Sequence, residues 1–180
     1  MFLNKVDIRL ILSGHFATLR DNRVVGKTSV QDLLLFFGVP AVLGIGLTWY
    51  GFRFRVDAVN GFLNVFAILT GLLLNMLVLV FTLSTTAGQP DVEKNKRRTL
   101  LKEIFANLCF AVLVSIAVVC IAVVALSYMR SQPGATTGIG ATFSLSALTA
   151  NFVLTLLMVM KRMFILLNKE VGNDAVSRVA

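Results

Sequence analysis

Residues 104–129 read IFANLCFAVLVSIAVVCIAVVALSYM and contain no Asp, Glu, Lys, Arg or His. An α-helix needs about 20 apolar residues to cross the roughly 30 Å hydrocarbon core of a bilayer. This stretch is longer than that, and it lacks the alternation of a membrane β-strand. It therefore predicts a transmembrane helix, and with it an all-α integral membrane protein.

Three further uncharged runs are long enough to cross a bilayer: Leu33–Phe52, Gly61–Leu83 and Ala141–Met160. The composition agrees, since 57% of the residues are hydrophobic and only 14% are charged, against about 25% charged in a soluble domain. A water-soluble enzyme and a disordered chain are both excluded by these values. The sequence predicts four transmembrane helices.

The predicted organisation has seven segments. These are an N-terminal cytoplasmic amphipathic arm (1–30), a first span (31–52), a second span (61–83), a basic cytoplasmic loop (84–103), a third span (104–129), a fourth span (141–160) and a cytoplasmic tail (161–180).

The distribution of positive charge predicts the orientation. Of the 17 Lys and Arg residues, only Arg53, Arg55 and Arg130 fall in the connections that follow the first and third spans. The others lie in the arm, the basic loop and the tail. Because cytoplasmic segments carry the excess of Lys and Arg, both termini are expected in the cytoplasm. Topology thus accounts for most of the net charge of +8, without direct binding of nucleic acid.

The arm carries apolar residues at helical spacing, namely Ile8, Leu12, Phe16 and Leu19. Such a helix either lies in the headgroup layer or packs against another subunit. His15, the only histidine, is expected to be an interface or core residue rather than a metal ligand.

The first span contains residues that shape a helix. Pro40 lacks a backbone N–H, so a kink near Phe36 and Phe37 is expected. The pair Gly44 and Thr48 would allow a second helix to approach closely. An aromatic belt at the outer interface is formed by Trp49, Tyr50 and Phe52.

Each of the other spans has a stripe of polar or small residues. The stripes are Asn64, Gly71, Asn75 and Thr82, with Ile68 and Val78 in the same row; Asn107, Ala111, Ser115, Val118 and Ala122; and Ser144, Asn151, Thr155 and Met158. An uncharged amide in hydrocarbon needs a hydrogen-bond partner. The asparagines Asn64, Asn75, Asn107 and Asn151 therefore either hold a helix bundle together or line the pore of an oligomer.

The spans lack the groups that several function classes require. Proton-coupled exporters need an ionisable residue in the membrane, and none occurs in the four runs. No catalytic pair and no metal or haem ligand set lies within a span, so the sequence predicts no enzyme activity, no cofactor and no metal.

The cytoplasmic segments carry the predicted partner-binding residues: His15, Arg20, Asp21 and Arg23 of the arm, and Lys94, Lys96, Arg97 and Arg98 of the basic loop. We expect the arm to expose its four residues beside an apolar stripe. The basic run contacts lipid headgroups, and it would also suit an acidic cytoplasmic protein.

The whole plan resembles the small four-span membrane proteins of bacterial anti-phage systems. It is similar in outline to the membrane subunit of the Kiwa system and to small membrane accessories of RNA-targeting CRISPR systems. The resemblance is carried by the arm segment LILSGHFATLR (10–20), the four uncharged spans and the basic loop. It implies oligomerisation and a cytoplasmic effector or sensor partner.

Two functions are consistent with these features. The first is an oligomeric scaffold or sensor in the bacterial inner membrane, a tetramer as the first guess, that recruits or activates a cytoplasmic protein in anti-phage defence. The second is a pore-forming effector that depolarises the cell. A holin-like protein or a small transporter fits less well, because holins seldom carry so long an amphipathic arm.

Overall fold

The computed structural model describes residues 8–18, 34–85, 92–132 and 134–177, with side chains at 8–18, 34–82, 98–132 and 134–168. All elements in this part of the chain are helices. They are α1 (Arg9–Thr18), the π-helical turn η2 (Leu34–Gly38), α3 (Val39–Trp49), α4 (Val56–Thr85), α5 (Val92–Arg130) and α6 (Ile139–Ser177).

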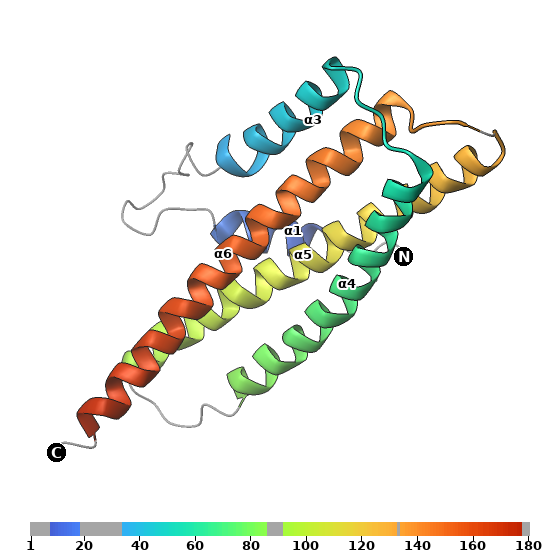
Figure 1. Cartoon of the computed structure of the whole chain (residues 1–180). Coiled ribbons are helices and arrows are strands. Elements are labelled where there is room, and N and C mark those ends of the chain that lie inside the picture. The colour runs from blue at the N-terminus through green and yellow to red at the C-terminus, as the bar shows by residue number, and fades with distance from the viewer. Residues whose placement is uncertain (1–7, 19–33, 86–91, 133, 178–180) are drawn as a thin grey trace, which may run out of the picture.

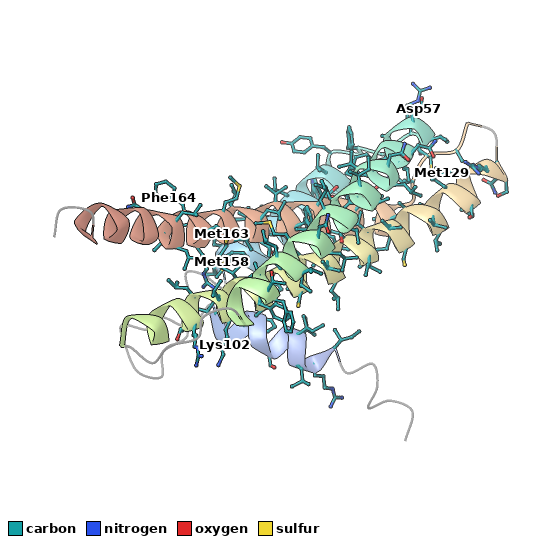
Figure 2. All side chains as sticks on the ribbon, turned by 90° about the horizontal axis from the view of Figure 1, so that it is seen from below. Asp57, Lys102, Met129, Met158, Met163 and Phe164 are labelled. Carbon is teal, nitrogen blue, oxygen red and sulfur yellow. The ribbon has the colours of Figure 1, made fainter. Side chains whose placement is uncertain are left out.

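Helix α5 is the centre of the fold. It packs against α1, α4 and α6, while α3 covers the far side of α6 (Figure 1). The connections α3–α4 and α5–α6 lie at one end of the bundle, and the C-terminus lies at the other. Figure 2 shows Asp57 and Met129 at the first end and Lys102 near α1. The all-helical architecture is therefore confirmed.

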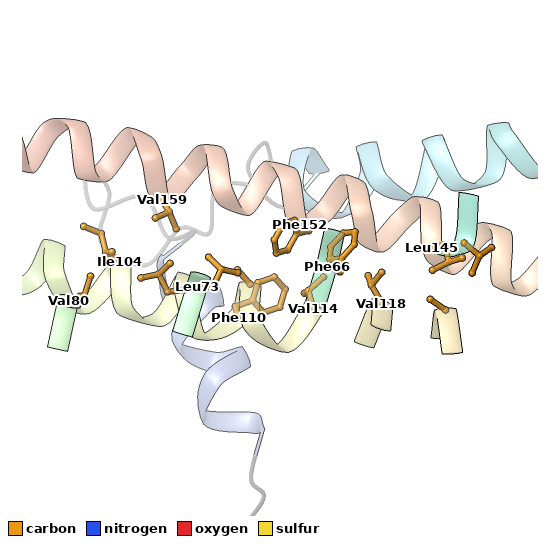
Figure 3. Packing of buried hydrophobic residues seen from close by; sticks show 14 of the residues in the cluster. Phe66, Leu73, Val80, Ile104, Phe110, Val114, Val118, Leu145, Phe152 and Val159 are labelled. Atoms are coloured by element: carbon orange, nitrogen blue, oxygen red, sulfur yellow. The ribbon is translucent and has the colours of Figure 1, made fainter. Parts of the chain in front are cut away.

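The apolar core lies between α4, α5 and α6, as Figure 3 shows. Phe66 of α4 meets Phe152 of α6 edge to face, with ring centroids 4.9 Å apart. Val114 and Val118 of α5 fill the space beside them. Side chains from three helices thus interdigitate in one continuous core, which fixes the long helices relative to one another.

Three helices are long and apolar enough to cross a membrane: Val56–Thr82, Arg98–Arg130 and Ile139–Asn168. The segment of the predicted first span is shorter, a five-residue π-helical turn followed by an eleven-residue α-helix that ends at Trp49. An eleven-residue α-helix is only about 16 Å long. That the first span crosses the membrane, which makes four spans in all, therefore stays a prediction. The cytoplasmic location of both termini stays a prediction as well.

The long helices continue beyond the predicted spans. Residues 92–103, predicted as part of a loop, are the first turns of α5, and residues 161–177, predicted as a tail, are the end of α6. Lys, Arg and Glu are good helix formers, and neither segment contains a proline. Helix formation therefore does not stop where the apolar sequence stops.

The α3–α4 and α5–α6 connections are tied to each other. The backbone N–H of Phe54 donates to the hydroxyl of Thr137 at 2.9 Å, and the N–H of Thr137 donates to the carbonyl of Phe54 at 3.0 Å. Each connection also contains a glycine with a left-handed backbone, Gly51 at φ +72° and Gly134 at φ +81°, which only glycine adopts without strain. The α3–α4 and α5–α6 ends of the bundle are thus held together.

Candidate functional site

Helix α1 of the arm packs against α5 of the same chain. Gly14 lies at this contact, and a Cβ at that position would be in ordinary van der Waals contact with the Cβ of Ala106, at 3.5 Å. Leu12 is partly buried against the core, whereas Leu10 is 75% exposed. Residues 9–18 of the arm are thus helical, and their described contact is with their own bundle. Of the predicted apolar stripe, Leu12 is partly buried, Ile8 and Phe16 are exposed, and Leu19 lies outside the described residues.

His15 is the side chain that anchors α1. It is fully buried, and its Nδ1 lies 2.8 Å from Oδ1 of Asn107 on α5. The imidazole stacks on the ring of Phe110, with centroids 3.9 Å apart and planes 8° from parallel, and the ring of Phe36 meets it edge-on. The histidine is therefore held by one hydrogen bond and two ring contacts that come from two other elements, α5 and η2.

The last turn of α1 is joined to both long helices. The hydroxyl of Thr18 donates to Oδ1 of Asn107 at 2.9 Å, and Arg162 of α6 donates to the carbonyl of Thr18 at 2.8 Å. Arg162 also forms an ion pair with Glu103 of α5, with a nitrogen–oxygen distance of 3.2 Å. A cation at the C-terminus of a helix is favourable because it meets the negative end of the helix dipole. We call His15, Thr18, Glu103, Asn107 and Arg162 the docking cluster.

The hydrogen bond to Asn107 shows which ring nitrogen of the histidine carries a proton, and burial favours its neutral form. Because Oδ1 of Asn107 can only accept, Nδ1 of His15 carries the proton. Burial lowers the pKa of His15 and Arg162 lowers it further, while the hydrogen bond to Asn107 acts in the opposite direction. The neutral imidazole therefore has a lone pair on Nε2. Among the described residues neither this atom nor Nδ2 of Asn107 has a partner, so the cluster is not saturated.

A second buried asparagine, Asn151, binds the short helical segment formed by η2 and α3. Pro40 cannot donate to the carbonyl of Phe36, four residues earlier, and the π-helical turn lies at this point. Nδ2 of Asn151 on α6 donates to the Phe36 carbonyl at 2.8 Å. The predicted disturbance near Phe36 is therefore present, and its free carbonyl has a partner on α6.

The three polar stripes have different environments. The stripe on α5 faces the interior, with Asn107, Ala111, Ser115, Val118 and Ala122 all fully buried. Asn151 and Thr155 of α6 are also buried, whereas Asn64 and Asn75 of α4 are exposed. The four asparagines are thus not brought to one pore or seam, since two lie inside the bundle and two outside it.

The predicted partner-binding residues are only partly described. Arg98 is exposed on α5. Arg20, Asp21 and Arg23 lie outside the described residues, as do the side chains of Lys94, Lys96 and Arg97. The expectation that the arm exposes His15 is wrong, because the imidazole is buried between α1, η2 and α5. Its partner Asn107 lies 92 residues away in sequence.

Sequence reasoning missed Thr18, Glu103 and Arg162. A usable signal existed, since Glu103 directly precedes the third uncharged run and Arg162 lies just after the fourth. Opposite charges at the same predicted membrane face are candidates for an ion pair.

The docking cluster joins α1 to α5 and α6 through hydrogen bonds and one ion pair. No group of three or more His, Cys, Asp or Glu side chains that could hold a metal occurs in the described part of the chain. Comparison with family models gives no match, and comparisons with curated proteins and with solved structures give no significant match.

Proposed function

We propose that the chain is an oligomeric membrane scaffold or sensor that recruits or activates a cytoplasmic protein, and that α1 is the element that responds to this partner. In this proposal the protein lies in the bacterial inner membrane, η2 and α3 form the first of four spans, and both termini are cytoplasmic. The anti-phage setting rests on the outline of the sequence, and a nuclease or other defence gene beside this one would support it.

The observation that supports the proposal best is the docking cluster. It joins the arm to α5 and α6 where the apolar run of each helix meets its charged part. On the predicted topology this is the cytoplasmic boundary of the bilayer. A protein that binds the arm or the basic residues therefore acts directly on the contacts that hold α1.

The arm is also suited to a reversible change. A helix of ten residues is only marginally stable alone, so α1 depends on its contacts with α5 and α6. Within the described residues, Nε2 of His15 and Nδ2 of Asn107 in this contact lack partners. A partner that binds the released arm more tightly than the docked arm would shift this equilibrium.

The test compares two buried polar residues of α5 in the full chain. Asn107→Leu removes the acceptor of both His15 and Thr18, whereas Ser115→Ala removes the contact with Thr70 of α4 and a bond to the backbone of α5 itself, and touches no contact of α1. A photoreactive residue at the exposed position Lys102 reports cytoplasmic proteins in living cells. We expect Asn107→Leu to release α1 to added protease and to change partner capture roughly tenfold, while Ser115→Ala changes neither.

A second comparison tests the basic residues. Charge reversal at Lys96, Arg97 and Arg98 should abolish capture at Lys102, since complementary charge steers and orients association. If Asn107→Leu releases the arm without changing capture or activity, α1 is not the responding element. If charge reversal also leaves capture intact, the scaffold proposal fails.

The pore remains the second candidate, and the exposed asparagines of α4 favour it. In an oligomer, Asn64 and Asn75 could line an aqueous path. The pore hypothesis expects membrane depolarisation on activation, and loss of this ion flux in the Asn64→Leu/Asn75→Leu variant while partner capture survives. Charge reversal would then leave the ion flux unchanged.

A further inference from the structure

Helix α4 has two opposite faces, and only one of them is used by the bundle. Every seventh residue along the first face is buried: Val59, Phe66, Leu73 and Val80 are between 0% and 6% exposed. This face packs on α5. Among the described helices, α5 is the one whose backbone lies beside the backbone of α4. The opposite face is exposed from Gly61 to Val78.

That opposite face has a regular repeat. Its residues are separated alternately by three and four positions and are all exposed: Gly61, Asn64, Ile68, Gly71, Asn75, Val78 and Thr82. We call them the α4 seam. A repeat of 3.5 residues is the pattern of a helix that packs along its length against another helix with a left-handed crossing. The repeat spans most of α4, so it is more than one isolated pair of small residues.

The asparagines of the seam lack partners. Neither Asn64 nor Asn75 makes a side-chain hydrogen bond with any described residue, and both lie within the apolar helix Val56–Thr82. Lipid tails offer no hydrogen bonds, so an amide there needs a partner from protein or water. The exposed central parts of α5 and α6 differ, since they are mostly aliphatic and aromatic, as at Val123, Val124 and Leu157.

We infer that the α4 seam is the contact between two copies of this chain, which pair through parallel α4 helices. Copies inserted with the same topology must present α4 in the same direction. A two-fold axis along the membrane normal then places each seam residue beside its own counterpart. An amide is both donor and acceptor, so Asn64 and Asn75 each meet a complementary group.

The small residues of the seam allow this approach. A Cβ built on Gly61 or Gly71 would meet nothing within 4 Å in the single chain. Gly71 lies between the two asparagines and lets the helix backbones come close enough for the amides to reach across. No charged side chain lies on the seam between Gly61 and Thr82, so two copies do not repel each other there. The inference rests on the oligomer of the proposed function and identifies the surface through which its copies bind. It does not depend on the arm.

Disulfide crosslinking in native membranes tests the inference, in a chain whose Cys109 and Cys120 are replaced by Ala. Single cysteines at Gly71, Asn75 and Val78 should form dimers, since facing residues of such a pair lie within disulfide reach. Control cysteines at Leu72 and Leu79 are similarly exposed but lie beside the seam, and should crosslink at most one-tenth as much. A cysteine at Leu157 on α6 serves as the control for random collision.

Substitution gives a second, independent measurement. In the full chain with its native cysteines, Asn64→Leu/Asn75→Leu should weaken association in lipid bilayers roughly tenfold, and Gly71→Leu should weaken it at least as much. The matched control Leu72→Ala should leave association unchanged. Unchanged helix content and protease resistance show that each variant is folded.

Two outcomes would overturn the inference: equal crosslinking at Leu72 and Gly71, or crosslinking only from α6. A chain that is monomeric in bilayers would do so as well. Loss of partner capture with the seam crosslinks intact would instead count against the scaffold, so the two proposals fail separately.

Discussion

At the scale of single residues, buried polar groups at the ends and bends of helices decide the packing. His15 and Asn107 join the arm to α5. Asn151 donates to the carbonyl of Phe36, to which Pro40 cannot donate. In each case the two partners of the hydrogen bond are far apart in sequence. Such groups cost free energy when unpaired, so their partners are strictly selected.

Asn151→Leu should destabilise the protein by about 1–3 kcal/mol, because the buried carbonyl of Phe36 would lose the donor that Asn151 supplies. The matched control is Thr155→Val, which removes only a bond to the backbone of the same helix. Unfolding in detergent measures both. Adding Pro40→Ala, which restores a backbone donor near Phe36, should recover part of the loss. An equal loss in both single variants would contradict this account.

The sequence predicts these residues incompletely. It identifies Pro40 as the cause of a local bend and Asn107 and Asn151 as amides that need partners. It does not show that Asn107 binds His15, because helical periodicity relates residues of one helix and these two residues lie on different helices. The sequence left two expectations for His15, an interface or core residue and an exposed partner-binding residue. Its burial agrees with the first and contradicts the second.

At the scale of elements, long uncharged runs predict where helices cross the membrane but not where the helices end. The uncharged run Ile104–Met129 lies inside α5, which begins at Val92. Charged residues with high helix propensity continue a helix into water, so the end of an apolar run is not the end of a helix. The small-residue pattern was more informative, because Gly44 does lie at a close contact between α3 and α6.

Gly44→Ala should destabilise the protein by about 1–3 kcal/mol. A Cβ there would lie 2.8 Å from Cδ2 and 3.1 Å from the backbone oxygen of Phe143, and the backbone cannot move aside easily. Gly46 has nothing within 4 Å, so Gly46→Ala should be neutral or stabilising by up to about 1 kcal/mol. Unfolding midpoints of the two variants in the same detergent give the comparison, and equal midpoints would show that the α3–α6 contact adapts.

At the scale of the whole molecule, the distribution of charge is the strongest clue to orientation. The end with the two tied connections holds Arg53, Arg55 and Arg130, and the other end holds the basic starts and ends of α5 and α6. The overall helical fold followed from composition alone. The number of spans did not, because α3 with η2 is shorter than the other three apolar helices.

Cysteine labelling tests the orientation in a chain without Cys109 and Cys120. A cysteine at Ala135 should react with a membrane-impermeant reagent added to spheroplasts, and a cysteine at Asn95 should react only after lysis. An odd number of spans would instead put the two termini on opposite sides. A reporter fused after Ala180 and one fused before Met1 distinguish these cases, and the reverse labelling pattern would contradict the predicted topology.

The burial of His15 makes docking of the arm a proton-linked equilibrium. Since burial lowers the pKa of the docked imidazole below its ordinary value near 6.5, the released arm binds protons more readily than the docked arm. Docking is thus fully favoured above pH 6.5 and weakens as the pH falls below it. Protease cleavage within α1 should rise between pH 7.5 and 5.5. His15→Gln, which keeps the neighbouring Glu103 and Arg162, should abolish this rise, whereas persistence of the rise would assign it to another group. Acidification of the cytoplasm would then act on the arm without any protein partner.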